Sequence, residues 1–221
     1  MKAAELQYSF KTEDYFSHAR QEIWPLLPRH ASRALEVGCG GGHTLALLKK
    51  QGLCDWACGI EISPAAARQA AQRLDKVVQG NIEVMDLPVE AGSIDLLLCL
   101  DVLEHLIDPW DALKRLSTLL SKDGVLVASI PNVRHFGVLL PLMIHGRWDY
   151  LDSGILDRSH LRFFTRATAI ELIESSGLLV EQVIATNPHA GHWKYRLLKS
   201  ITLSRAQPYF EFQYLIHATK R

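Results

Sequence analysis

The chain has 221 residues, which is enough for one large domain and short for two independent ones. Its residues are 48% hydrophobic and 22% charged, a balance typical of a packed globule and not of a disordered or fibrous chain. Lys plus Arg and Asp plus Glu both total 24, so no basic field favours nucleic acid as a partner, and none is expected.

The start of the chain, Met1 to Arg20, carries charged residues among apolar ones and lacks the unbroken apolar region of a secretory signal. The longest apolar stretches, Ile94 to Leu100 and Phe136 to Ile144, are far shorter than the roughly 20 residues that span a bilayer. We therefore expect a cytoplasmic protein with no membrane insertion. The cysteines form no CxxC pair and are predicted to be buried free thiols; they are Cys39, Cys54, Cys58 and Cys99.

The first predicted elements are a helix, a strand and a second helix. Apolar residues near a 3.6 period predict a helix from Asp14 to Leu27, closed by prolines. The short apolar run from Arg33 to Val37 precedes a set of glycines and predicts a buried strand. Thr44 to Gln51 predicts a helix that ends at Gly52.

The alternation of strand and helix then repeats. Strands are predicted at Trp56–Ile60, Lys76–Gln79, Ile94–Leu100 and Val125–Ile130, and helices at Pro64–Leu74 and Pro109–Leu120. Strands that are apolar on both faces indicate a mostly parallel sheet with helices on both sides. The predicted class is therefore a doubly wound α/β fold.

The alternation stops after Pro131. Residues 132–166 mix aromatic and charged side chains without a clean period, so we expect an irregular insertion that covers the substrate. Regular structure resumes with a helix at Ala167–Ser176, a strand at Leu178–Ala185 and a last strand near Phe210–Ala218. No linker or repeat is visible, so residues 1–221 are predicted to form a single domain.

A glycine-rich turn follows the first predicted strand. Gly38, Gly40 and Gly42 come directly after Glu36-Val37, and a predicted helix follows them. Glycines let a ligand approach the backbone closely, and a helix start offers free N–H groups. The position between strand and helix favours a ligand site over a mere tight turn.

Two acidic residues indicate the kind of ligand. Glu61 ends the next strand, 25 positions after Glu36, where a carboxylate can accept hydrogen bonds from a ribose diol. His43 occupies the position where the dinucleotide fingerprint needs Gly or Ala, which disfavours NAD. The charge of Glu36 would repel a pyrophosphate and attract a cation. S-adenosylmethionine (SAM), which has a sulfonium and an ammonium and no phosphate, fits these features better.

These residues resemble the motifs of class I SAM-dependent methyltransferases. Residues 35–42 (LEVGCGGG) look like motif I and residues 59–63 (GIEIS) like motif II. The later motifs of the same family have similar segments in this chain at residues 80–83 (GNIE), 86–95, 100–106 (LDVLEHL) and 119–126 (LLSKDGVL). The likeness runs from about Ala34 to Pro131 in the family's order, and it implies a Rossmann-like, seven-stranded sheet whose last strand is antiparallel.

The resemblance also implies a role for individual positions. Glu36 and the backbone from Gly38 through Cys39 and Gly40 to Gly42 would hold the methionine part, and Glu61 the ribose hydroxyls. The adenine would meet Ile62, Asn81 and Ile82, and the carbonyl of Leu100 would face the ammonium. Many family members have Asp where Asn81 stands, but an amide can still hydrogen-bond an adenine edge.

Methyl transfer from a sulfonium requires alignment and exclusion of water, and no metal ion is expected. If the acceptor is a hydroxyl, a histidine can take its proton. His135, after the fifth strand, and His160, which Asp157 would orient, are the predicted candidates, with a plain loop role equally open for both. His105 is interpreted mainly as structural or close to the cofactor.

The predicted insertion gives hints about a small-molecule acceptor. Arginines outnumber aspartates there, which suits an anionic group, although arginines packed on aromatics and paired with aspartates fit equally well. Residues 131–135 and 145–165 resemble a methyltransferase subgroup associated with bacterial glycan and surface-polysaccharide assembly, which implies a sugar-linked acceptor.

Two other functions stay open. One is N-methylation of protein or nucleic acid, which is weakened because residues 100–103 (LDVL) lack the Asn/Asp-Pro-Pro-aromatic signature of amino methyltransferases that act on bases. The other is a SAM-binding module without catalysis.

Overall fold

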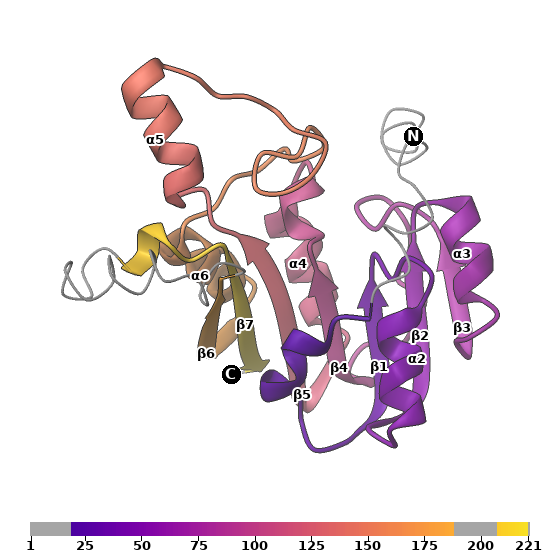
Figure 1. Ribbon diagram of the computed structural model, residues 1–221. Coiled ribbons are helices and arrows are strands. Elements are labelled where there is room, and N and C mark those ends of the chain that lie inside the picture. The colour runs from indigo at the N-terminus through magenta and orange to yellow at the C-terminus, as the bar shows by residue number, and fades with distance from the viewer. Residues whose placement is uncertain (1–18, 188–206, 221) are drawn as a thin grey trace.

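The computed structural model describes residues 19–187 and 207–220. A seven-stranded sheet in the order β3-β2-β1-β4-β5-β7-β6 forms the centre of the fold (Figure 1). Its strands are β1 (Ala31–Val37), β2 (Cys54–Glu61), β3 (Lys76–Gln79), β4 (Ile94–Leu100), β5 (Leu120–Pro131), β6 (Leu178–Thr186) and β7 (Gln213–Lys220). The α-helices are α2 (His43–Lys50), α3 (Pro64–Ala70), α4 (Pro109–Ser117), α5 (Phe136–His145) and α6 (Arg166–Ser175). Short 3-10 helices are η2 (Gln21–Leu26), η3 (Leu103–His105) and η4 (Gln207–Tyr209).

The strand directions confirm the predicted doubly wound sheet. Strands β3, β2, β1, β4 and β5 pair in parallel, and β7 pairs antiparallel with both β5 and β6. The chain order reverses between β1 and β4, so the carboxyl ends of these two strands border the crevice in which open α/β sheets bind ligands.

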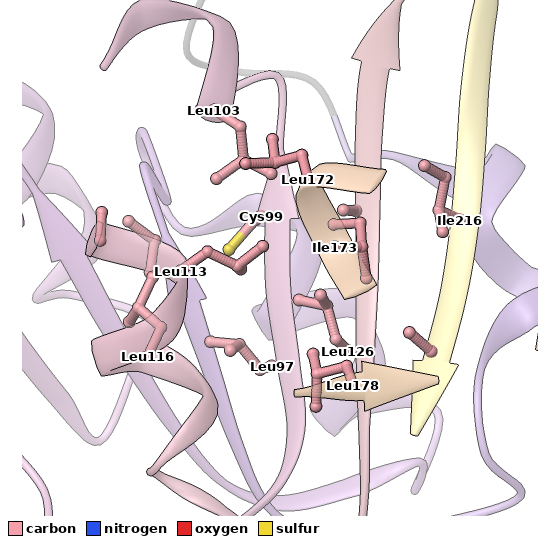
Figure 2. Close-up of a cluster of buried hydrophobic side chains, with 14 of the residues drawn as sticks. Leu97, Cys99, Leu103, Leu113, Leu116, Leu126, Leu172, Ile173, Leu178 and Ile216 are labelled. Atoms are coloured by element: carbon pink, nitrogen blue, oxygen red, sulfur yellow. The ribbon is translucent and has the colours of Figure 1, made fainter. Parts of the chain in front are cut away.

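One face of the sheet is covered by α4 and α6. Leu113 and Leu116 of α4 and Ile173 of α6 pack against alternate residues of the strands, such as Leu97 of β4 (Figure 2). All of these side chains are buried. Burial of each large side chain contributes about 1.5–3 kcal/mol, so this layer stabilises the parallel strands and the antiparallel strands β6 and β7 together.

The opposite face is covered by η2, α2 and α3. Leu45 and Leu48 of α2 and Ile23 of η2 pack against the other set of alternate strand residues, including Leu96 and Leu98. The period-two alternation along β4 therefore serves two cores, which explains why every residue of that strand except Asp95 is buried.

The predicted helix from Asp14 to Leu27 was wrong in its described part, because only η2 (Gln21–Leu26) is helical and it is a 3-10 helix. Pro25 lies inside it and has no N–H to donate, which favours the tighter turn. Residues 14–18 of that prediction lie outside the described residues.

The expectation of an irregular segment after Pro131 was also partly wrong, because α5 lies within it. His135 caps the start of α5, its Nδ1 accepting a hydrogen bond from the N–H of Gly137, and Gly146 ends the helix at φ +62°. Its sequence, FGVLLPLMIH, is apolar nearly all round and contains Pro141, so it has no 3.6-residue period. Residues 146–165 then return toward the top of α4 (Figure 1).

The four cysteines are buried and free, as predicted. Among the described residues, no helix is long and apolar enough to cross a membrane.

Candidate functional site

A cavity of about 290 Å³ opens at the carboxyl ends of β1, β2 and β4. It is lined by Arg20, residues 36–40, Thr44, residues 60–62, residues 80–83, residues 100–102, His105 and Leu106. Every predicted cofactor residue except Gly42 lies in this lining. The sequence therefore brings the acidic strand ends and the glycine turn to one place.

The glycine turn is held by β2 and leaves no room for side chains. The N–H of Gly38 donates to the carbonyl of Ile60 at 2.8 Å. Gly38 and Gly40 have φ values of +67° and +52°, a region that favours glycine. A Cβ on Gly38 would lie 2.7 Å from Cγ2 of Val102, so the backbone itself forms the cavity wall.

Gly42 has a packing role instead. It has φ +78° at the N-terminus of α2, and a Cβ there would lie 3.1–3.2 Å from atoms of Leu74 and Ala70. The absence of a side chain lets α2 approach the end of α3. The structure thus places Gly42 at a helix contact and outside the cavity lining.

Glu61 anchors the turn as well as lining the cavity. Its carboxylate accepts hydrogen bonds from the N–H groups of Gly40 and Ser63, both at 2.8 Å. The residue is 4% exposed, and burial raises the pKa of its carboxyl while the backbone hydrogen bonds lower it. The turn and the end of β2 are therefore fixed relative to each other before any ligand binds.

Glu36 is the less satisfied of the two carboxylates. It is buried at the end of β1, and its Oε2 has no hydrogen-bond partner. Burial raises the pKa of its carboxyl to about 8, although the positive charge of Arg20 lowers it; the charge of Glu61 raises it further. A cationic ligand in the cavity would compensate for this unsatisfied acceptor.

The other end of the cavity is less polar. Ile62 and Ile82 line it, and Ile82 is only 5% exposed. The Oδ1 of Asn81 accepts a hydrogen bond from the N–H of Glu83 at 2.9 Å, which orients the amide. The arrangement suits a flat aromatic ring with one polar edge.

Sequence reasoning missed Arg20 and, as a site residue, Asp101. The guanidinium of Arg20 forms an ion pair with Asp101 at 2.5 Å, and the hydroxyl of Ser129 donates to the same carboxylate at 2.8 Å. Asp101 has φ +54°, a strained conformation for a non-glycine residue, directly after β4. Its position at a strand end was a usable signal, whereas nothing local marked Arg20.

His135 does not line the cavity. Its ring packs on Phe136 and Phe212, with ring centroids 4.5 and 5.6 Å away, and the residue is 7% exposed. Its described contacts are those of a helix cap in an aromatic cluster.

His160 also lies outside the lining but is next to a residue that belongs to it. Its ring meets the ring of His105 edge to face, with centroids 4.7 Å apart. Its Nδ1 lies 2.9 Å from the carbonyl of Ile155, whereas Asp157, the predicted orienting group, accepts from the hydroxyl of Ser159 at 2.6 Å. The pair His105–His160 therefore reaches the cavity, and His135 does not.

The arginines of residues 132–166 have partners close by. Arg147 pairs with Asp149 and Arg158 with Asp152, at 2.8 and 3.1 Å. Arg134 lies over the ring of Tyr209, and Arg162 donates to the carbonyl of Ile107. Of the two roles considered for these arginines, this arrangement matches the one in which they pair with aspartates and pack on aromatic rings.

Comparison with known proteins places the chain among methyltransferases. A family model described as "Methyltransferase domain" matches residues 9–183. A "Ubiquinone biosynthesis O-methyltransferase" of Xanthomonas campestris pv. campestris is 28% identical over 167 residues, which cover 68% of this chain and 67% of that protein.

Solved structures share the fold. A SAM-dependent methyltransferase of Thermotoga maritima, described as a possible histamine N-methyltransferase, is similar with a TM-score of 0.63 and 22% identity, covering 100% of this chain and 94% of the other. A SAM-dependent methyltransferase of Archaeoglobus fulgidus has a TM-score of 0.66 and 17% identity over 97% and 98% of the two chains. At these identities the likeness extends to the fold alone.

Proposed function

Because the chain belongs to the methyltransferase-domain family, we propose that it transfers a methyl group from SAM to a hydroxyl oxygen of a small acceptor, a sugar or another anionic metabolite. The protein is a SAM-dependent methyltransferase of class I. The single observation that carries the assignment of the site is the cavity in which Glu36, Glu61 and the bare glycine turn converge.

The residues present fit the cofactor at both ends of the cavity. The unsatisfied Oε2 of Glu36 and the backbone from Gly38 through Cys39 to Gly40 suit the cationic methionine part. Glu61 suits the ribose hydroxyls, while Ile62, Asn81 and Ile82 suit the adenine and Leu100 offers its carbonyl. Gly42 would contribute indirectly, by allowing α2 to pack close behind the turn.

Residues 132–166 are proposed to cover the acceptor. The segment begins at the carboxyl end of β5, and its far end is bound to the cavity wall. The N–H groups of Leu161 and Arg162 donate to the carbonyl of Glu104 at 2.8 and 2.9 Å. A cover fixed in this way excludes water from the transfer, in which SAM supplies an electrophilic methyl group when bound.

The proton of the acceptor hydroxyl needs a destination. Of the predicted bases, His160 is better placed than His135, because His160 contacts His105 and His105 lines the cavity. Replacing His160 by Ala should lower kcat at least tenfold with little loss of SAM affinity, and His135→Ala should change kcat less. Equal turnover in wild type and His160→Ala would remove this residue from the mechanism.

The proposed acceptor is supported by a relative, by the exposed arginines and by a sequence likeness. The named relative is an O-methyltransferase, which favours a hydroxyl oxygen. Exposed ion pairs such as Arg147–Asp149 are worth about 0–1 kcal/mol, so these arginines can exchange an aspartate for a carboxylate or phosphate of the acceptor. The sugar assignment depends on the likeness of residues 131–135 and 145–165 to glycan-associated methyltransferases.

Thermal unfolding with SAM tests the cofactor site. At a SAM concentration of about 100 Kd, the folded state gains about 2.7 kcal/mol, which corresponds to a rise in Tm of about 5–10 °C. Glu61→Ala should abolish most of this rise, and the exposed control Glu171→Gln on α6 should retain it. Unchanged melting of the wild type at millimolar SAM would contradict the proposed site.

A screen with methyl-labelled SAM tests the acceptor. Nucleotide sugars, lipid-linked saccharides and small phenols or carboxylates are incubated with the protein, and transferred label is counted. Label on saccharides alone supports the proposal, whereas label on phenols alone excludes the sugar assignment and leaves the methyltransferase assignment intact.

A further inference from the structure

Three side chains with metal-binding atoms meet at the wall of the cavity. Glu104 and His105 come from η3, and His160 comes from the covering segment, 55 positions later in the chain. One potential ligand atom from each lies within 4.8 Å of the others. His105 also lines the cavity, so the cluster adjoins the place where the acceptor would bind.

Both histidines are held with the same ring nitrogen turned to a backbone carbonyl. Nδ1 of His105 lies 3.1 Å from the carbonyl of Ser159, and Nδ1 of His160 lies 2.9 Å from the carbonyl of Ile155. A carbonyl can only accept, so each Nδ1 carries a proton, and in the neutral ring it is Nε2 that has the lone pair for a metal ion. Histidines that bind metals are commonly oriented by an outer bond of this kind.

Glu104 supplies an unsatisfied carboxyl group. The residue is 1% exposed, and neither of its oxygens has a hydrogen-bond partner. Nε2 of His160 lies 3.9 Å from its Oε1. An ionised carboxylate in such a place costs several kcal/mol unless a cation balances it.

The charges around the cluster favour a cation. Asp101 and Asp157 both act on Glu104 with negative charge, while Arg20 is the positive group that opposes them. Arg20 is already paired with Asp101. The carboxylates around the cluster therefore outnumber its one guanidinium, which favours a bound cation beside Glu104.

We propose that Glu104, His105 and His160 bind a divalent transition-metal ion, Zn²⁺ being the best match. Two imidazoles and a carboxylate suit zinc and not magnesium, which prefers oxygen ligands. Donor atoms about 2.1 Å from a common tetrahedral ion lie about 3.4 Å from one another. The three ligand atoms, which lie within 4.8 Å of one another, would have to move closer together by about an ångström.

The role of the ion rests on the proposed function. Three protein ligands leave a fourth position, which the acceptor's hydroxyl oxygen would occupy, and the ion would lower the pKa of that hydroxyl. The hydroxyl would lose its proton to solvent as it enters the site, before the transfer; the oxygen lone pair then forms the new C–O bond, and the C–S bond breaks with its electron pair on sulfur. In this arrangement His160 would act as a ligand in place of the base role proposed above.

Metal binding is measured first without any acceptor. The full chain is stripped with a chelator and titrated with Zn²⁺ against a chromophoric chelator, and the retained metal is counted by mass spectrometry. We expect about one ion per wild-type chain, and binding at least about 100-fold weaker in Glu104→Gln and His160→Gln. His30→Gln is the matched control, since His30 pairs with the exposed Asp55 at the other end of β1, and it should bind like the wild type.

Cobalt absorption gives a second measurement that needs no variant. Co²⁺ bound to the stripped wild type should give the intense visible bands of four-coordinate geometry. No uptake at equimolar metal, or equal uptake in Glu104→Gln, His160→Gln and wild type, would overturn the proposal. A SAM-induced rise in Tm in the stripped protein shows separately whether the cofactor site is intact.

Discussion

At the scale of single residues, the two buried carboxylates of the cavity differ in their partners. Glu61 accepts two backbone hydrogen bonds, whereas one oxygen of Glu36 accepts none. Glu61 is therefore already organised, and Glu36 has more to gain from a bound cation. The difference predicts that Glu36 couples ligand binding to pH more strongly than Glu61 does.

Binding of SAM should release a proton from Glu36. The pKa of the free carboxyl is about 8, and a cation beside it lowers that pKa, so affinity rises with pH below about 8. We expect the affinity for SAM to increase by up to tenfold per pH unit between about pH 5.5 and 7.5. The α-amino group of SAM titrates above this range. Calorimetry at pH 7 in two buffers of different ionisation enthalpy measures the released proton. Glu36→Gln should bind SAM more weakly and release none; the same release from this variant would assign the proton elsewhere.

Gly59 should be intolerant of even one methyl group. A Cβ there would lie 2.4 Å from Sγ of Cys39 and 3.0 Å from Leu74, which fixes the glycine turn against β2. Gly59→Ala should lower the free energy of unfolding by about 1–3 kcal/mol, as overpacking does, and weaken SAM binding. Urea unfolding of Gly59→Ala and of Gly59→Ala combined with Cys39→Ala measures this, and the second change should restore part of the loss. If the two losses are equal, contact with the sulfur is not the cause.

At the scale of elements, the sequence predicted the parts of the fold that have a simple period. Both β3 and β4 were predicted with the bounds they have. Strand β4 is an apolar run buried on both faces, which leaves a clear pattern, whereas β3 is an edge strand with two apolar residues between polar ones. Helix α5 was missed because its apolar residues surround the axis, and its caps His135 and Gly146 lie in the segment that was predicted to be irregular. Patterns report which face is buried, so they fail for a helix that is apolar all round.

The two sides of α5 should respond differently to truncation. Val138 is 5% exposed and packs with Ile155 and Leu156, whereas Met143 is 80% exposed. Val138→Ala should cost about 1–2 kcal/mol and Met143→Ala less than about 0.5 kcal/mol. Urea unfolding of each variant gives these values. A large cost for Met143→Ala would mean that something covers the exposed face.

The residues of the site were predictable only where a local sequence pattern marks them. The glycine turn and the strand-end acids follow from spacing along two adjacent strands, so Glu36 and Glu61 could be found. Arg20 and the contact of His160 with His105 depend on chain segments that meet only in the folded protein. The two carboxylate oxygens of Glu104 lack hydrogen-bond partners, and this too depends on the residues around Glu104 in the fold and not on its neighbours in sequence.

At the scale of the whole molecule, one core extends from the parallel strands to the antiparallel strand β7. Val37 and Ile60 of the first strands belong to the same cluster as Ile216 of β7. We expect a single cooperative transition in urea, with tryptophan fluorescence and far-UV circular dichroism coincident. Ile216→Ala should shift that transition by about 2–4 kcal/mol without splitting it. Two separated transitions would show that these two parts of the sheet unfold independently.

The position of β7 between β5 and β6 has a consequence for biosynthesis. Because β7 follows β6 in the chain yet separates it from β5, neither edge can be paired until residues 213–220 have left the ribosome. Until then β5 and β6 each have an unpaired edge, and such edges are prone to pair with the wrong strand. The parallel strands β1 to β5 pair with one another without any later residue, so this part of the sheet can form during that time and limit the exposed surface.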